Sequence, residues 1–78
     1  MPRFRFAHTD DSFTEADAAR LDVAGGLLRL QSLQNGVLAT IRQLATSDVV
    51  SVQRRNTELN GAWSWTTVWV NPDAPRRD

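Results

Sequence analysis

Three side chains near the N-terminus are of the types that build a hydrolytic triad: His8, Asp10 and Ser12. A triad works only where the serine, the imidazole and the carboxylate converge around one substrate atom. Residues two positions apart on a strand end and its turn do not converge in this way. The sequence also has no cysteine and no second histidine to offer another nucleophile or base. It therefore predicts no catalytic site and a chain that is not an enzyme.

Four acidic residues in the same region could supply oxygen ligands to a hard cation: Asp10, Asp11, Glu15 and Asp17. They lack the alternating order, the central glycine and the terminal glutamate of a calcium loop. The glycine-rich patterns that bind nucleotide phosphates are missing as well. We therefore expect an ordinary acidic turn, with no metal site and no cofactor.

All nine basic residues are arginines, and nine acidic residues balance them, so the formal net charge is zero. A neutral chain has no overall field that would attract nucleic acid or an anionic membrane. Exposed arginine pairs in such a chain usually serve as solubilising charge, so nucleic-acid binding is not favoured and membrane binding is not expected. The candidates for contact with an anion or a nucleic acid are Arg29, Arg54, Arg55, Arg76 and Arg77.

Trp63, Trp65 and Trp69 stand two and four positions apart, a spacing that places them on one face of an extended strand. An aromatic side chain buries about 150 to 250 Å², so the three represent about 450 to 750 Å² of apolar surface. A soluble monomer rarely exposes an apolar patch larger than about 300 to 600 Å². We therefore expect the stripe to be covered, either as core or as an interface with another subunit or partner. The sequence leaves these two alternatives open.

Alternation of polar and apolar residues predicts strands at residues 3 to 6, 49 to 55 and 62 to 70. Asn35-Gly36 between two apolar runs predicts a hairpin, because a tight hairpin turn needs positive φ at both central positions. Residues 13 to 24 carry a divided signal, with helix formers and a capping pair at the start and strand-like alternation at the end.

Together these segments predict an all-β protein, a small antiparallel barrel or sandwich of five or six strands. A short helix near residues 13-20 is an alternative for that segment. Residues 1-70 would form a single domain, and residues 71-78 a polar, proline-containing tail that we expect to be flexible. The expected core is small and includes part of the tryptophan stripe. Its other members are Phe4, Phe6, Leu21, Val23, Leu28, Leu30, Ile41, Val50 and Val52.

The hydrophobic rhythm of residues 3 to 55 supports the same fold. Phe4-Arg5-Phe6, Leu21-Asp22-Val23, Gly25-Gly26-Leu27-Leu28, Val37-Leu38-Ala39-Thr40-Ile41 and Val49-Val50-Ser51-Val52 carry this rhythm. They resemble segments of small, uncharacterised all-β proteins of actinobacteria and their phages. The resemblance includes no chemically reactive residue, so it implies a fold and no activity.

A second resemblance points to a different class of protein. Residues 13 to 23 and the Leu27-Leu28-Arg29-Leu30 that follows are similar to the helix-turn-helix of excisionase-like proteins, with residues 49 to 70 as a wing. Such proteins are DNA-binding accessory proteins. Against this alternative, Gly25-Gly26 stands where the recognition helix would open, and few side chains that reach base edges follow it. The implied contacts are Arg29 and Gln31 in a groove and Arg54 and Arg55 on the wing.

A small core without disulfides usually depends on a partner or a second subunit. We therefore expect a non-enzymatic structural or protein-interaction module that acts as a homo-oligomer or on a larger protein partner. A small phage or actinobacterial assembly component fits this description. The alternatives are the winged helix-turn-helix protein and, least favoured, a protein that binds single-stranded nucleic acid or carbohydrate on its tryptophan face. The interface candidates are Trp63, Trp65 and Trp69.

The hydropathy of the chain bears on its location. No apolar run reaches the about 18 to 20 residues that span a bilayer. The first residues show no apolar segment of the kind that signal peptides carry. We expect a cytoplasmic or virion-associated protein.

Overall fold

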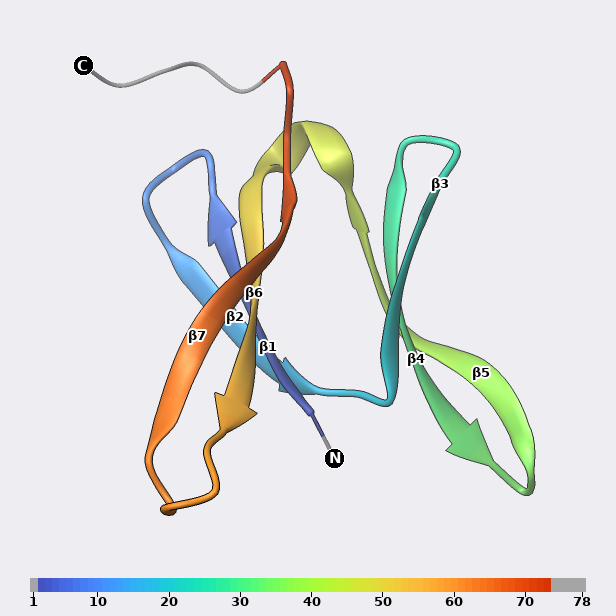
Figure 1. The fold of residues 1–78 in the computed structure, drawn as a ribbon. Helices are drawn as coiled ribbons and strands as arrows, with labels where there is room; N and C mark the ends of the chain where they lie inside the picture. The colour runs from blue at the N-terminus through green and yellow to red at the C-terminus, as the bar shows by residue number, and fades with distance from the viewer. Residues whose placement is uncertain (1, 74–78) are drawn as a thin grey trace.

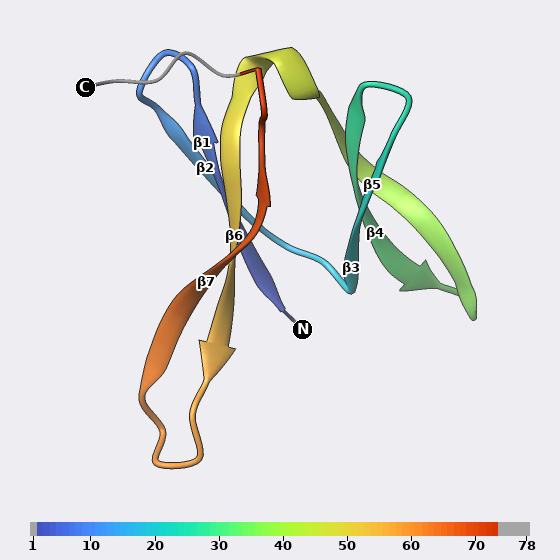
Figure 2. The ribbon, with the colours of Figure 1, turned by 45° about the horizontal axis from the view of Figure 1, so that its top comes forward.

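A computed structural model of the chain describes residues 2–73 and contains two antiparallel sheets, seen side by side in Figure 1 and Figure 2. The four-stranded sheet has the order β2-β1-β6-β7, and the three-stranded sheet has the order β3-β4-β5. The strands are β1 (Arg3–His8), β2 (Phe13–Asp17), β3 (Arg20–Ala24), β4 (Leu27–Gln34), β5 (Val37–Ala45), β6 (Val49–Thr57) and β7 (Trp63–Val70), with the 3₁₀ turn η1 (Thr46–Asp48) between β5 and β6. The expected all-β class is confirmed, and the open sheets exclude the closed barrel. The described residues form seven strands, where the sequence led us to expect five or six.

Two of the tight turns form where residues with positive φ occur together. Asn35 and Gly36 have φ of 52° and 80° and join β4 to β5, which confirms the predicted hairpin. Gly25 and Gly26, with φ of 58° and 75°, join β3 to β4 in the same way. These turns set the register of the whole three-stranded sheet.

The short helix considered near residues 13-20 does not form. Residues 13 to 17 are strand β2, and every one of them pairs with β1. The Arg3 guanidinium bridges Glu15 at 3.3 Å and Asp17 at 3.2 Å across this pair. Pairing with β1 outweighs the modest helix propensity of the segment, because strand edges gain hydrogen bonds along their whole length.

The core lies between the inner faces of the two sheets. Phe4, Phe6 and Val52 from the four-stranded sheet and Leu28 and Leu30 from the three-stranded sheet are buried, as the alternation predicted. Ala18 and Val49 complete the buried apolar cluster without having been expected, while Leu21 packs against it and Val50 is half-buried.

The prediction that Val23 and Ile41 belong to the core is wrong. Val23 is 42% exposed and Ile41 is 43% exposed. Val23 belongs to the edge strand β3, and Ile41 is the extra residue of a β-bulge in the edge strand β5, opposite Leu30 and Gln31. An edge strand is covered on fewer sides, and a bulge residue leaves the regular alternation.

The two sheets are connected through short, tightly bonded segments. The Ala18 N–H donates to the Pro2 carbonyl at 3.0 Å, and the Ala19 N–H donates to the Gln31 carbonyl at 2.8 Å. Adjacent residues thus bond to different sheets, which explains why a small side chain is fully buried at the crossover. On the return, η1 carries the chain from β5 to β6.

The segment that follows β7 begins with an anchored residue. The Asn71 side-chain amide donates to the carbonyls of Thr46 and Val49, each at 3.0 Å, and its N–H donates to the Val50 carbonyl at 2.9 Å. The structure describes only residues 71 to 73 of the expected flexible tail. The remainder, residues 74–78, lies outside the described residues.

Candidate functional site: an aromatic and arginine face

The three tryptophans do not share one face of β7. A β-bulge at Val68 shifts the register, so that Trp69 lies opposite Val52 whereas Trp65 lies opposite Arg55. Val52 is buried on the inner face, and Arg55, three positions further along a regular strand, points to the outer face. The expectation of a single tryptophan stripe is therefore wrong, because one unpaired residue reverses the alternation.

Each tryptophan consequently has its own environment. Trp69 is half-buried and packs against the core cluster. Trp65 is half-buried on the outer face of the four-stranded sheet, and Trp63, opposite Thr57, is 59% exposed on the same face. Only Trp63 and Trp65 thus remain to form an external surface.

On this outer face Arg5, which belongs to β1, contacts side chains from the three other strands of its sheet. Its guanidinium carbon lies 4.3 Å from the centre of the Trp65 ring and 5.7 Å from that of Phe13. Its Nε donates to Gln53 Oε1 at 3.0 Å, and one terminal nitrogen donates to the same oxygen. A planar cation between two rings interacts with the negative face of each ring, which restricts the rotamers of all three side chains.

The cluster continues to the end of β7. Trp63 and Trp65 meet edge to face, with ring centres 6.1 Å apart and an interplanar angle of 86°. The Arg55 guanidinium lies 5.7 Å from the centre of the Trp63 ring. Phe13, at the far side, is 65% exposed. We call this surface the aromatic–arginine face, and its members are Arg5, Phe13, Gln53, Arg55, Trp63 and Trp65.

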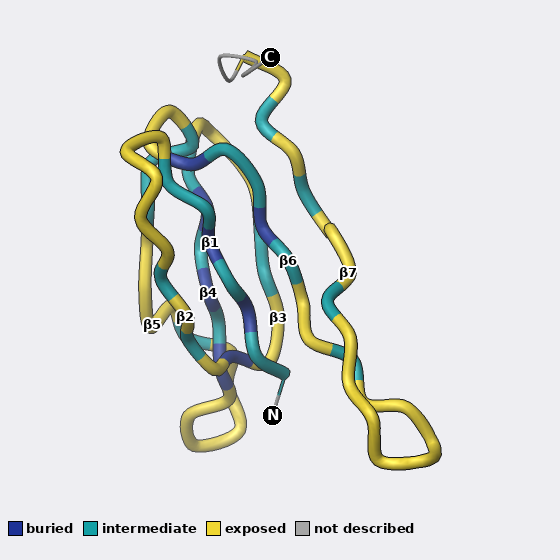
Figure 3. Tube along the Cα trace, turned by 90° about the vertical axis from the view of Figure 1, so that its left-hand side faces the viewer, coloured by how far each residue is buried: buried dark blue, intermediate teal, exposed yellow. Residues whose placement is uncertain are grey.

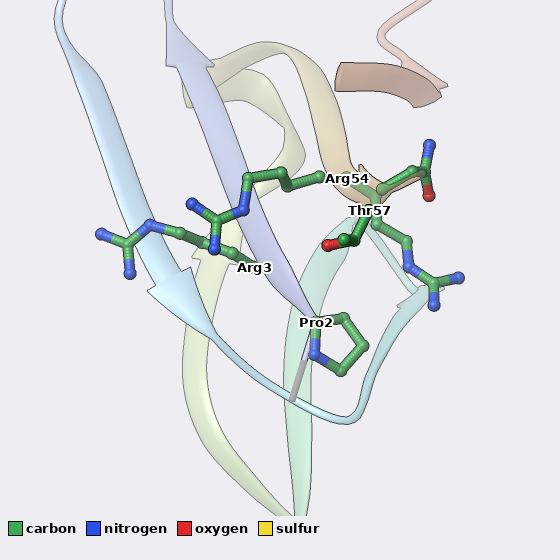
Figure 4. Close-up of a pocket in the computed structure, with 6 residues that line it drawn as sticks. Pro2, Arg3, Arg54 and Thr57 are labelled. Carbon is green, nitrogen blue, oxygen red and sulfur yellow. The ribbon is translucent and has the colours of Figure 1, made fainter. Parts of the chain in front are cut away.

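An open hollow lies beside this face, where β1 begins and β6 ends (Figure 4). The Glu15 carboxylate, hydrogen-bonded to Arg3, raises the pKa of the Arg3 guanidinium above its ordinary value, and Asp17 acts in the same direction. The positive charge of Arg3 is therefore balanced by the carboxylates of Glu15 and Asp17. Within residues 2–73, no ion pair involves Arg54 or Arg55. The lining residues are Pro2, Arg3, Arg54, Arg55, Asn56 and Thr57.

The arginines singled out from the sequence do not form one patch. Arg54 and Arg55 are neighbours on a strand and point to opposite faces of the sheet. Arg29 lies in the other sheet and donates to Asp22 at 2.6 Å across the β3–β4 pair. Arg76 and Arg77 lie outside the described residues. Of these candidates within residues 2–73, Arg54 and Arg55 lie together, in the hollow that Arg3 also lines, and Arg29 lies apart from them.

His8, Asp10 and Ser12 line a second open hollow, with Thr9 and Asp48, but are not bonded as a triad. The Ser12 hydroxyl donates to Asp10 Oδ1 at 2.5 Å, and His8 Nε2 pairs with the Thr14 hydroxyl at 2.6 Å. The Ser12 hydroxyl and N–H lower the pKa of Asp10 below its ordinary 3.8. The imidazole therefore does not activate the serine in this arrangement. Among residues 2–73 no group of three acids, histidines or cysteines could hold a metal ion.

Sequence reasoning missed half of the face. Arg5, Phe13 and Gln53 come from three different strands, and no motif links them along the chain. They meet because β1 pairs with both β2 and β6, which brings Arg5 beside a residue 48 positions away. The only local signal is that each stands at an outward position in an alternating run.

The fold and this face together define an open, two-sheet antiparallel β protein with an external cluster of aromatic and arginine side chains. Comparisons with protein-family models, with curated proteins and with solved structures find no match for the chain. The described residues include no helix that is long and apolar enough to cross a membrane.

Proposed function

We propose that the chain is a non-enzymatic protein-interaction module that binds a protein partner through the aromatic–arginine face. The observation that carries the proposal is the exposure of Trp63, stacked edge to face on Trp65 and accompanied by Arg55. Tryptophan and arginine are the residues most enriched among the hot spots of protein interfaces. The earlier resemblance to actinobacterial and phage proteins favours an assembly component as the specific form of this role.

The arrangement of the cluster supports binding beyond its composition. Arg5 is held by two rings and by Gln53, and Trp63 is held by Trp65 and Arg55. Side chains that are already ordered lose little rotamer entropy when a partner covers them, a cost of about 0.5 to 1.5 kcal/mol for each mobile side chain. A preordered face therefore retains more of the gain from burying its aromatic surface.

The winged helix-turn-helix alternative has lost its structural basis. The segments that would be its two helices are strands β2, β3 and β4, and the implied groove residue Arg29 is engaged with Asp22. Readout of base edges by a recognition helix needs a helix in that position. The protein-interaction role is therefore the one we propose.

Affinity capture with matched variants tests the proposal. The tagged chain is incubated with an extract of the cells that produce it, alongside the double variant Trp63→Ala, Arg55→Ala. The control is Leu33→Ala, Arg42→Ala, which removes an exposed apolar residue and an exposed arginine from the three-stranded sheet. We expect the original chain and the control to retain the same partner and the double variant to lose it at least tenfold.

Circular dichroism and thermal denaturation of all three proteins establish that each is folded. Equal retention of the partner by both double variants would place the contact elsewhere. If no protein is retained by the original chain above the level of an empty matrix, the interaction role itself is wrong.

A further inference from the structure

Strand β7 is an edge strand that contains no charged residue and no proline. It pairs with β6 on one side over its full length, and no strand among residues 2–73 pairs with its other side. Eight extended residues leave an edge about 27 Å long. The unpaired N–H and C=O groups of such an edge are a template for another strand.

Edge strands are normally protected by charge, by proline or by short length. The other three edge strands among residues 2–73 all carry charged residues: Glu15 and Asp17 in β2, Arg20 and Asp22 in β3, and Arg42 in β5. Strand β7, with the sequence WSWTTVWV, carries neither a charge nor a proline. Its single protective feature is the bulge at Val68.

The two faces of β7 are also poorly covered. Ser64 and Thr66 point to the inner side and are exposed, which means that the three-stranded sheet does not extend beneath this part of the strand. Figure 3 shows β7 at the outer edge of the four-stranded sheet, beyond β6, with most of its trace exposed. The exposed apolar residues Val68 and Val70, at 46% and 60%, stand at its C-terminal end.

We propose that β7 pairs antiparallel with the β7 of a second copy, which would join two four-stranded sheets into one continuous sheet of eight strands. A two-fold axis near Thr66 and Thr67, at the middle of β7, relates the two strands, so that each N–H and C=O of one edge can meet its counterpart on the other. The strand then runs alongside its own copy in the opposite direction, so that the unpaired N–H and C=O groups of the two edges face each other.

The charge distribution of the chain is compatible with a second copy at this edge. Identical strands place identical residues close to the axis, and like charges there would repel. Strand β7 has no charge, and the chain as a whole has a formal net charge of zero. A contact limited to one strand edge and its flanking side chains is small, so we expect dissociation in the micromolar range.

Sedimentation velocity of charge variants tests this pairing. Thr67 is exposed near the middle of β7, and no other side chain is hydrogen-bonded to it within the described chain. We expect the original chain to sediment with twice its mass of 8.7 kDa at high micromolar concentration. Thr67→Lys and Thr67→Glu should each sediment as monomers, because like charges meet at the axis. An equimolar mixture of the two should restore the dimer.

Thr40→Lys is the matched control, because Thr40 is an exposed threonine on the edge strand β5 of the other sheet. This variant should dimerise as the original chain does. Circular dichroism verifies that every variant is folded.

A second measurement uses the absence of cysteine from the sequence. Single cysteines at Ser64, Thr66, Thr67 and Val68 should include at least one that forms an intermolecular disulfide on mild oxidation, since paired strands bring Cα atoms within about 7 Å. Thr40→Cys should form none.

Three results would overturn the pairing. They are a monomeric original chain at several hundred micromolar, a Thr67→Lys variant as dimeric as Thr40→Lys, or an assembly larger than two copies, since a two-fold edge contact closes at the dimer. The pairing uses main-chain groups of the β7 edge, whereas the proposed partner contact uses the side chains of Trp63 and Arg55 on the outer face. The Trp63→Ala, Arg55→Ala variant distinguishes the two, because it should lose the partner while the Thr67 variants lose the dimer.

Discussion

At the scale of single residues, hydrogen bonds to Asp10 replace the catalytic contacts that its neighbours could have made. The Ser12 hydroxyl and N–H both donate to Asp10 Oδ1, so the serine stabilises the turn between β1 and β2. This bonding stabilises the carboxylate form and lowers the pKa of Asp10. The contribution of the bond to folding is therefore present above the ordinary pKa and is lost as the pH falls through the folded pKa.

Ser12→Ala should raise the pKa of Asp10 toward its ordinary 3.8, but not fully, because the backbone N–H of residue 12 still donates to the carboxylate. Titration of the Asp10 carboxyl carbon by NMR measures the shift. Ser51→Ala, a serine on β6, should leave the Asp10 titration unchanged. A pKa of Asp10 that does not move in Ser12→Ala would contradict the role assigned to the hydroxyl.

The Asn71 side chain joins the end of β7 to η1 and the start of β6. Its amide donates to two carbonyl oxygens, and Asn71→Asp removes both donors while it directs a carboxylate at those oxygens. We expect Asn71→Asp to lower the free energy of unfolding by about 1 to 3 kcal/mol at neutral pH. Asn71→Ala, which introduces no charge, should lower it by less. Urea denaturation measures both variants, and an Asp variant as stable as the original chain would contradict this account.

At the scale of elements, residues that fix local geometry could be predicted and residues that depend on a distant strand could not. Asn35-Gly36 defines its hairpin because positive φ is a local requirement. The strand at residues 13 to 17 depends on pairing with β1, which no local preference specifies. The bulge at Val68 likewise exists only relative to Val52 and Gln53 on β6, so its effect on the tryptophans was not predictable from their spacing.

The bulge supplies a test of how β7 is built. Deletion of Val68 places Trp69 three positions after Trp65, and this odd spacing still puts the two side chains on opposite faces of a regular strand. We expect this deletion to lower the free energy of unfolding by no more than about 1 kcal/mol, since the bulge residue has no cross-strand partner.

Insertion of one alanine after Val68 is the contrasting change, because Trp69 can then stay opposite Val52 only if the bulge becomes wider, and otherwise the pairing with β6 shifts by two residues. Urea denaturation followed by tryptophan fluorescence compares the two variants. The insertion should cost clearly more stability than the deletion. The reverse order would show that the bulge is required for packing.

At the scale of the whole molecule, the all-β class follows from short alternating segments, but the arrangement of the sheets does not. The order β2-β1-β6-β7 joins Arg5 to Gln53 across 48 positions, and the chain enters and leaves the second sheet between them. Such pairings are decided by the packing of the entire core. The sequence could therefore indicate a strand rich in tryptophan without indicating that Trp69, and not Trp63, packs against the core.

The small core and the open edge of β7 have a joint consequence for thermal stability. Within the described residues, seven apolar side chains form the buried cluster, and a small domain of this kind has a small free energy of unfolding. Pairing of two copies through β7 would stabilise the folded state by mass action, because unfolded chains do not pair. We expect the melting temperature to rise with protein concentration in the original chain and in Thr40→Lys. In Thr67→Lys it should be independent of concentration. Scanning calorimetry across a hundredfold range of concentration measures this, and a melting temperature that does not change with the concentration of the original chain would mean that its folded state does not depend on a second copy.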